Sequence, residues 1–163
     1  MKPRAAAAAL AVALALAAMV IAACGYGFSQ RYVAAGGVDR IHVRPFENRS
    51  TEPDLGALVT AALRSELARR GSDAGQGAAA VLDGEVRATE PALTSTAGTS
   101  WRIALELRAR LTAGEGRPVE RVVRRETDFL AGADPLETEG RRALALRRVA
   151  DEAARELLRA LER

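Results

Sequence analysis

The sequence is poor in the residues that catalysis, metal binding and covalent crosslinking require. Its 163 residues include one Cys and one His. A single Cys excludes an intrachain disulfide, and one Cys with one His cannot supply the three or four ligands of a zinc site. Gly-x-Ser-x-Gly, His-Glu-x-x-His and phosphate-loop patterns are also absent. We therefore expect a protein without catalytic residues, metal or cofactor, which is stabilised by core packing.

Lysine is missing after Lys2, so Arg carries the positive charge of everything that follows. The formal net charge of +3 includes Lys2 and Arg4, and it falls to +1 when residues 1–23 are left out. A charge this close to zero gives no reason to expect a nucleic-acid partner. Arg suits planar, bidentate contacts with carboxylate or phosphate, although a general Ala and Arg bias in composition explains the same content.

The first 23 residues have the plan of a secretory signal peptide. Lys2 and Arg4 form a basic start, and an unbroken run of Ala, Leu, Val, Met and Ile fills residues 5–23. Ile21-Ala22-Ala23-Cys24 resembles the lipobox of bacterial lipoproteins, which implies that Cys24 becomes the lipidated first residue of the mature protein. The alternatives are an uncleaved, Ala-rich transmembrane helix and a Cys buried at its end.

The residues after Cys24 indicate where the protein is held. Gly25 rather than Asp implies, in the sorting rule of many Gram-negative bacteria, a lipid anchor in the outer membrane on its periplasmic side. Several acyl chains on one residue make a durable anchor. Residues 24–37 are rich in Gly and dotted with aromatic residues, which indicates an extended tether. Residues 38–163 are enough for one domain with a single core.

The hydrophobic periodicity after residue 37 predicts the order strand, helix, three strands, helix. Alternation predicts strands over 38–46, 78–89, 101–111 and 118–130, and helical spacing predicts helices over about 53–70 and 134–161. Because each helix carries one apolar stripe, both must cover the same face of the sheet. The expected fold class is α+β, a two-layer sandwich with a four-stranded, mostly antiparallel sheet and two helices on one face.

The two helices have different start signals. Thr51 can cap the first helix, and Glu52 and Asp54 place negative charge on its first turn. The second helix begins with Asp134 and Pro135, the order expected of an N-cap and a first helical residue. Its expected buried stripe consists of Leu136, Ala143, Leu146, Val149, Ala150, Ala153, Leu157 and Leu161.

The polar face of the sheet carries charges that packing does not explain. Two neighbouring strands place arginines there, namely Arg102, Arg108 and Arg110 on the third and Arg121, Arg124 and Arg125 on the fourth. Like charges on facing strands cost energy unless acids or an anion lie between them. One interpretation is cross-strand pairing with Glu106, Glu120 and Glu126. The other is an anionic ligand, such as a phosphorylated glycolipid, held by charge-assisted hydrogen bonds.

Several short motifs, taken in order, resemble the LptE family of lipopolysaccharide-assembly lipoproteins. They are Cys24-Gly25-Tyr26 after the lipobox, Ile41-His42-Val43-Arg44-Pro45-Phe46-Glu47-Asn48, Pro53-Asp54-Leu55 at a helix start, and Ala80-Val81-Leu82-Asp83-Gly84-Glu85-Val86. The order of elements agrees over nearly the whole mature chain. The chain departs from the family pattern in having Gly27 where a larger residue is expected, and no Lys in the mature part.

The resemblance implies a non-enzymatic protein that plugs and helps to assemble the large outer-membrane β-barrel LptD. It also implies that the pair inserts lipopolysaccharide into the outer leaflet and that this protein binds lipopolysaccharide. No motif fixes the contact residues. Arg102, Arg108 and Arg110, together with a polar, hydroxyl-rich loop predicted over residues 89–100, are candidates for ligand binding from charge and expected exposure alone.

Two other functions compete with this one. The first is an outer-membrane lipoprotein of another envelope pathway, acting as a cell-wall synthase activator or as a lipid-transport partner. The second is a periplasmic hydrolase with an unrecognised site, against which the missing pairing of a nucleophile with a base argues.

Overall fold

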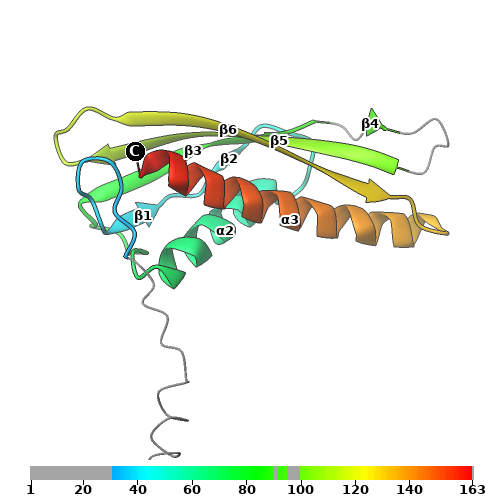
Figure 1. The fold of residues 1–163 in the computed structure, drawn as a ribbon, viewed down its shortest axis with the longest axis horizontal. Helices are drawn as coiled ribbons and strands as arrows, with labels where there is room; N and C mark the ends of the chain where they lie inside the picture. Colours follow the sequence, from blue (N-terminus) through cyan, green and yellow to red (C-terminus); the bar gives the residue numbers. More distant parts are fainter. Residues whose placement is uncertain (1–30, 90–91, 95–99, 163) are drawn as a thin grey trace, which may run out of the picture.

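The computed structural model describes residues 31–89, 92–94 and 100–162, which form two layers. One layer is a sheet, and the other consists of two helices that lie against one face of it (Figure 1). The elements are β1 (Ile41–Val43), β2 (Glu47–Asn48), α2 (Leu55–Arg69), β3 (Ala80–Ala88), β4 (Ala92–Leu93), β5 (Ser100–Ala113), β6 (Val119–Leu130) and α3 (Pro135–Leu161). The predicted α+β sandwich is confirmed, although its sheet has six strands.

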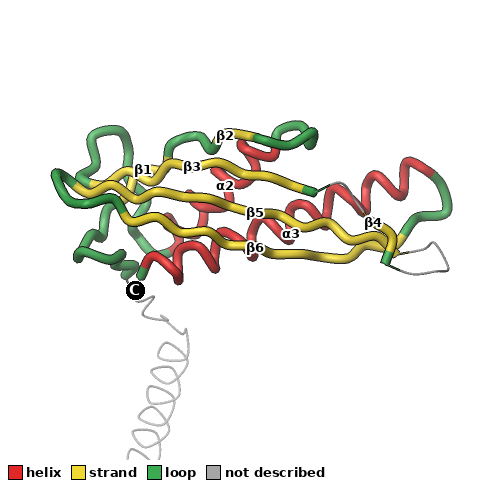
Figure 2. The backbone as a smooth tube through the Cα atoms, turned by 90° about the horizontal axis from the view of Figure 1, so that it is seen from above, coloured by secondary structure: helices red, strands yellow, loops and turns green. Residues whose placement is uncertain are grey.

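The longest strand, β5, lies inside the sheet, antiparallel to β3 on one side and to β6 on the other (Figure 2). β1 and β2 both pair with β3 in parallel, and β4 pairs with the end of β5 that β3 does not reach. The expected first strand is present as the shorter β1, which ends before Pro45, a residue with no backbone N–H to donate to a ladder. β2, which follows Pro45, is a strand that the sequence did not predict. β4 lies within the stretch that the sequence predicts to be a polar loop.

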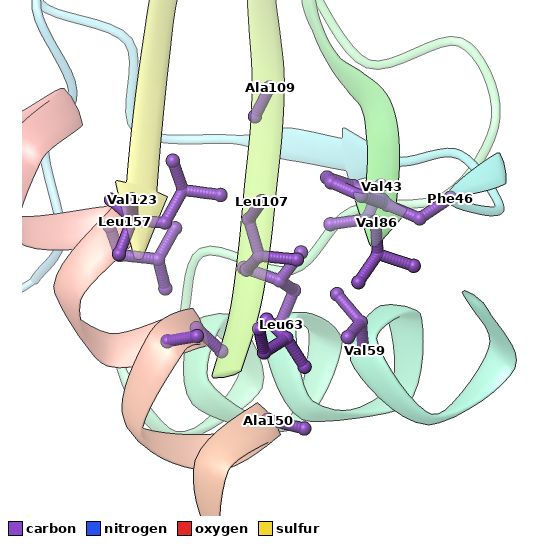
Figure 3. Close-up of a cluster of buried hydrophobic side chains, with 14 of the residues drawn as sticks. Val43, Phe46, Val59, Leu63, Val86, Leu107, Ala109, Val123, Ala150 and Leu157 are labelled. Carbon is purple, nitrogen blue, oxygen red and sulfur yellow. The ribbon is translucent and has the colours of Figure 1, made fainter. Parts of the chain in front are cut away.

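The core lies between the sheet and the helices and is built from alternate positions of the strands. The inner positions of β5 are buried along most of the strand, as its period-two pattern predicts. Figure 3 shows Leu107 of β5 and Val86 of β3 directed toward α2, which contributes Leu63, with Leu157 of α3 in the same cluster. These four side chains are completely buried. Apolar contact with one sheet face therefore holds both helices in place.

The start of α3 agrees with its sequence signal. Pro135 is the first helical residue, and the Asp134 carboxylate accepts a hydrogen bond from the Glu137 backbone N–H at 2.8 Å. The Glu137 carboxylate accepts from the Ala133 N–H at 2.6 Å. This backbone hydrogen bond, together with Arg141, holds the pKa of Glu137 below its usual range. The predicted cap of the second helix is confirmed.

The start of α2 differs from the prediction. The first helical residue is Leu55, and Asp54 precedes it at φ 56° without a side-chain hydrogen bond to the helix. Glu52 lies before the helix and is only 4% exposed, and its carboxylate pairs with Arg142 of α3. The interpretation of Glu52 and Asp54 as first-turn charges is therefore wrong. A residue far along the chain, which local sequence cannot reveal, binds the Glu52 carboxylate.

The helices differ in length, which leaves part of α3 without a neighbouring helix. α3 has 27 residues and α2 has 15, or about 40 and 22 Å of helix. The segment before α2 contacts Arg142, and the C-terminal ends of the helices meet where Arg70 pairs with Glu162 (Figure 1). Leu136, in the first turn of α3 and before Arg142, is 83% exposed, and Ala143, next to Arg142, is also exposed. The prediction that both belong to the buried stripe is wrong.

The first described residues pack onto the C-terminal end of α3. Tyr32 is 1% exposed, and its hydroxyl donates to the Leu158 backbone oxygen at 3.0 Å. The Ala35 N–H donates to the Leu161 oxygen at 2.7 Å. The Arg70 guanidinium lies 5.7 Å from the centre of the Tyr32 ring, within the range of a cation–π contact. Residues 32–35, which the sequence assigns to the tether, are thus packed against the domain.

The burial of Tyr32 predicts a loss of stability in alkali. Burial, with a smaller contribution from the charge of Glu162, raises the pKa of Tyr32, and Arg70 opposes the shift. The folded protein therefore holds the phenol proton more tightly than the unfolded chain. The full contribution should be present below the ordinary pKa of about 10 and should decline above it, by at most about 1.4 kcal/mol per pH unit. Urea titrations at pH values from about 9 to 11 measure this decline. Between these pH values the free energy of unfolding of Tyr32→Phe should fall by less than that of the unchanged protein. An equal fall would mean that Tyr32 does not cause the loss of stability in alkali.

Candidate functional site

The sheet face opposite the helices, here called the open face, is polar. The outward positions of the strands place charges of both signs on it, and the two segments that follow β1 and β2 add to them. The arginines are Arg44, Arg49, Arg87, Arg102, Arg108, Arg110 and Arg124. The acids are Glu47, Asp83, Glu85, Glu106, Glu120, Glu126 and Asp128. The open face can therefore form internal ion pairs and can also offer guanidinium donors to a ligand.

Arg102 and Arg110, two of the predicted ligand-binding residues, lie in cross-strand ion pairs. Arg102 donates to the two Asp128 carboxylate oxygens at 2.8 and 3.1 Å, and Arg110 donates to Asp83 at 3.2 Å. Each pair joins residues that are directly opposite in register. The hydrogen bond from Arg102 holds the pKa of Asp128 below its usual range. Both pairs are exposed and contribute little to stability, but each occupies a guanidinium with a carboxylate.

Arg108, the third predicted residue, lies between two carboxylates. Its Nε is 3.0 Å from Glu106 and 3.9 Å from Glu85. It borders a hollow of about 590 Å³ that Arg110 also lines, and a second hollow of about 410 Å³. The structure brings Arg108 and Arg110 together at the first hollow, whereas Arg102 lines neither.

Arg121 and Arg125 do not belong to the open face. They occupy inward positions of β6 and contact α3. The Arg121 Nε donates to the Ala160 backbone oxygen at 2.9 Å, and Arg125 pairs with Glu156 at 2.9 Å. The prediction that these two residues share the face of the other arginines is wrong. Because β6 is an edge strand, a long side chain at an inward position can keep its charged end at the rim of the sheet.

Arg49 and Arg87 also lie near Arg108. The sequence analysis did not predict either of them as a ligand-binding residue. The alternation of β3 already turns Arg87 outward. Arg49 follows β2 and reaches Glu47 at 2.9 Å and Glu85 at 3.5 Å. Its position depends on the parallel pairing of β2 with β3, which no local pattern in the sequence reveals.

Part of the predicted site lies outside the described residues. The structure does not describe Cys24, the predicted lipidation site, or residues 90–91 and 95–99 of the polar loop. Among the residues that the structure does describe, no group of three His, Cys, Asp or Glu side chains is placed to hold a metal ion. The same residues contain no helix that is long and apolar enough to cross a membrane.

Solved structures share this fold at low sequence identity. A candidate lipoprotein from Caulobacter crescentus is 20% identical with a TM-score of 0.56, and the match covers 75% of this chain and 87% of that one. A minor lipoprotein from Acinetobacter baumannii is 16% identical with a TM-score of 0.53, covering 77% and 91%. Rare lipoprotein B from Shewanella oneidensis is 12% identical with a TM-score of 0.52, covering 73% and 92%. No curated protein sequence matches the chain.

The comparison with protein families is more specific than these likenesses, which establish the fold alone. The family described as LptE, lipopolysaccharide-assembly, matches residues 38–161. This range includes all the strands and both helices of the described structure. It covers most of the chain and confirms the resemblance carried by the short sequence motifs. The chain belongs to the LptE lipopolysaccharide-assembly family.

Proposed function

We propose that this protein is a non-enzymatic outer-membrane lipoprotein that plugs and helps to assemble an LptD-like β-barrel. In this proposal the pair forms the translocon that inserts lipopolysaccharide into the outer leaflet. The observation that carries it is the LptE family match over residues 38–161, which spans every strand and helix described. The proposal includes lipidation of Cys24 and a location on the periplasmic side of the outer membrane.

The open face is physically compatible with a place inside a barrel. The interior of an outer-membrane barrel is polar and wet, so a domain that fits there must keep its charged groups hydrated or paired. The Arg102–Asp128 and Arg110–Asp83 pairs do so while staying exposed. The buried apolar side chains of the sheet lie on the other face, beneath the helices, and Val122 is an exposed apolar residue of the open face.

The packed N-terminal segment limits the distance between the domain and its anchor. With a lipid on Cys24, only residues 25–31 link the membrane to the buried Tyr32, and seven residues span at most about 25 Å. The proposal therefore places the C-terminal end of α3 next to the membrane. β4 and the start of α3 lie at the opposite end of the domain (Figure 1).

Lipopolysaccharide carries phosphate, so the proposal assigns its contact to the arginines of the open face. The sequence predicts Arg102, Arg108 and Arg110 as the contact residues. Arginine suits phosphate because a guanidinium group can donate two parallel hydrogen bonds. The ion pairs of Arg102 and Arg110 must open before these residues can bind an anion in this way. Because opening an ion pair costs free energy, the carboxylates around each arginine decide how well that arginine can bind phosphate.

Purification in mild detergent tests the partner. We expect full-length protein with a C-terminal affinity tag, solubilised from outer membranes, to bring down one large β-barrel protein in equimolar amount, identified by mass spectrometry. Crosslinks should then map to the barrel lumen. Mass spectrometry of the same sample should find acyl chains on Cys24. A lipidated protein that arrives alone, or with a cell-wall enzyme, would refute the barrel partner and favour a lipoprotein of another envelope pathway.

A further inference from the structure

Positive charge is in excess at one place on the open face. The hollow of about 410 Å³ lies over β3, β5 and β6, and its floor includes the small side chain of Ala104. Among the residues that the structure describes, Glu106 is the one acid that lines it, together with four arginines, which are Arg49, Arg87, Arg108 and Arg124. We call this the four-arginine hollow.

The register of the sheet explains why these charges meet. Glu106 on β5 is directly opposite Arg87 on β3 and Arg124 on β6, so a single acid stands between two arginines. Arg108 follows two residues later on the same side of β5 and donates to Glu106. Neighbouring strands are about 4.8 Å apart, so long arginine side chains from all three strands can reach one bound group.

The carboxylates near the hollow do not balance its arginines. Arg87 lies 3.4 Å from Glu85, which Arg49 and Arg108 also contact. Arg124 has no carboxylate within ion-pair distance in the described part of the chain. The four arginines thus share three acids, Glu47, Glu85 and Glu106.

The neighbouring hollow of about 590 Å³ is different. Among the described residues it is lined by as many acids as arginines, with Asp83, Glu85 and Glu120 beside Arg108 and Arg110, and with Arg121 bordering it from the inward side of β6. An anion entering there would meet carboxylates that already occupy the guanidinium groups. The four-arginine hollow is therefore the better place for an anion, because Arg124 has no ion pair with any described carboxylate and can bind the anion without breaking one.

We propose that the four-arginine hollow binds the phosphate group of a phosphorylated sugar. Guanidinium groups approaching from three strands can each donate charge-assisted hydrogen bonds to a tetrahedral phosphate, and the volume is adequate for a phosphate with one sugar ring. Glu106 competes with the phosphate for Arg108. The source of the sugar phosphate, a glycolipid headgroup, rests on the function proposed above; the recognition of phosphate does not.

Titration calorimetry with two variants of opposite effect tests the proposal. The full chain, purified in detergent, is titrated with glucose 1-phosphate and, separately, with a diphosphorylated glucosamine glycolipid in mixed micelles. Arg124→Gln should weaken phosphate binding about tenfold, by removing one charged donor. Glu106→Gln should strengthen binding several-fold, because Arg108 loses its competing carboxylate. Arg148→Gln, which removes the same charge from the exposed side of α3, is the matched control and should change nothing.

Each outcome decides the question. Binding of both probes, or of the glycolipid alone, with the two expected shifts supports the site and says whether the free headgroup suffices. Binding that responds equally to Arg124→Gln and Arg148→Gln reflects total charge and overturns the site. If Arg102→Gln and Arg110→Gln weaken phosphate binding and Arg124→Gln does not, the ligand binds at the ion-paired arginines and the proposed site is wrong. Barrel co-purification is measured independently, so the site can fail while the proposed partner stands.

Discussion

Replacement of Tyr32 by Ala is expected to lower the free energy of unfolding by about 3–5 kcal/mol, the usual cost of removing a buried aromatic side chain. Tyr32 is 1% exposed and lies against the C-terminal end of α3. Its backbone oxygen also accepts a hydrogen bond from the Ser72 hydroxyl at 3.2 Å. The Ala variant leaves a cavity under this junction and removes the ring over which the Arg70 guanidinium lies. Urea titration followed by the fluorescence of Trp101, the single Trp of the chain, measures the loss.

Tyr32→Phe separates the ring from the hydroxyl. The Leu158 oxygen also accepts the Glu162 backbone N–H at 3.1 Å, so no orphan acceptor remains when the hydroxyl is removed. We expect this variant to lose only about 1 kcal/mol, the net value of one hydrogen bond. If Ala costs no more than Phe, the segment before β1 is not part of the core, and the short link between anchor and domain proposed here is wrong.

The elements that the sequence predicts well are those with local causes. The outward arginines of β5 follow from strict alternation over a long strand. The cap of α3 follows from Asp134 and Glu137, three residues apart. The same helical period fails at Leu136, which has the spacing of a buried residue but is exposed. Periodicity identifies a helix face, but the length of the neighbouring helix decides how much of that face is covered.

The site is harder to read, because its charge balance depends on register. Arg102 and Arg110 stand out in the sequence as arginines on the cleanest strand, yet each faces an acid on the next strand. Arg124 and Glu106 are also opposite each other, but Glu106 is bound by Arg108. A shift of register by two residues would change every partner without altering the hydrophobic pattern. Which arginine is left without an acid is therefore visible only in the folded sheet.

Gly84→Val is expected to lower the free energy of unfolding by at least about 3 kcal/mol, the upper end of the usual range for overpacking a core. Gly84 lies in the middle of β3, opposite Ala109 of β5. A Cβ atom at Gly84 would overlap the Arg108 backbone oxygen and would lie 2.9 Å from both the Ala109 Cα and the Phe46 ring. Two of these three neighbours are backbone atoms of β5, which cannot rotate away, so the central ladder must shift.

Strand propensity alone predicts the opposite sign for Gly84→Val, because Val is favoured and Gly disfavoured in strands. A stability gain in urea titration would therefore mean that Phe46 and β5 do not approach Gly84 as closely as the structure shows. Gly140→Ala on α3 is the matched control: its Cβ would meet nothing within 4 Å, and a helical Gly→Ala change should stabilise by about 0.5–1 kcal/mol. If Gly84→Val lowers the free energy of unfolding and Gly140→Ala raises it, the cost at Gly84 comes from close packing. Phe46, which lies between β1 and β2 in a motif that resembles the LptE family, then packs so closely on β3 that position 84 requires a residue without a side chain.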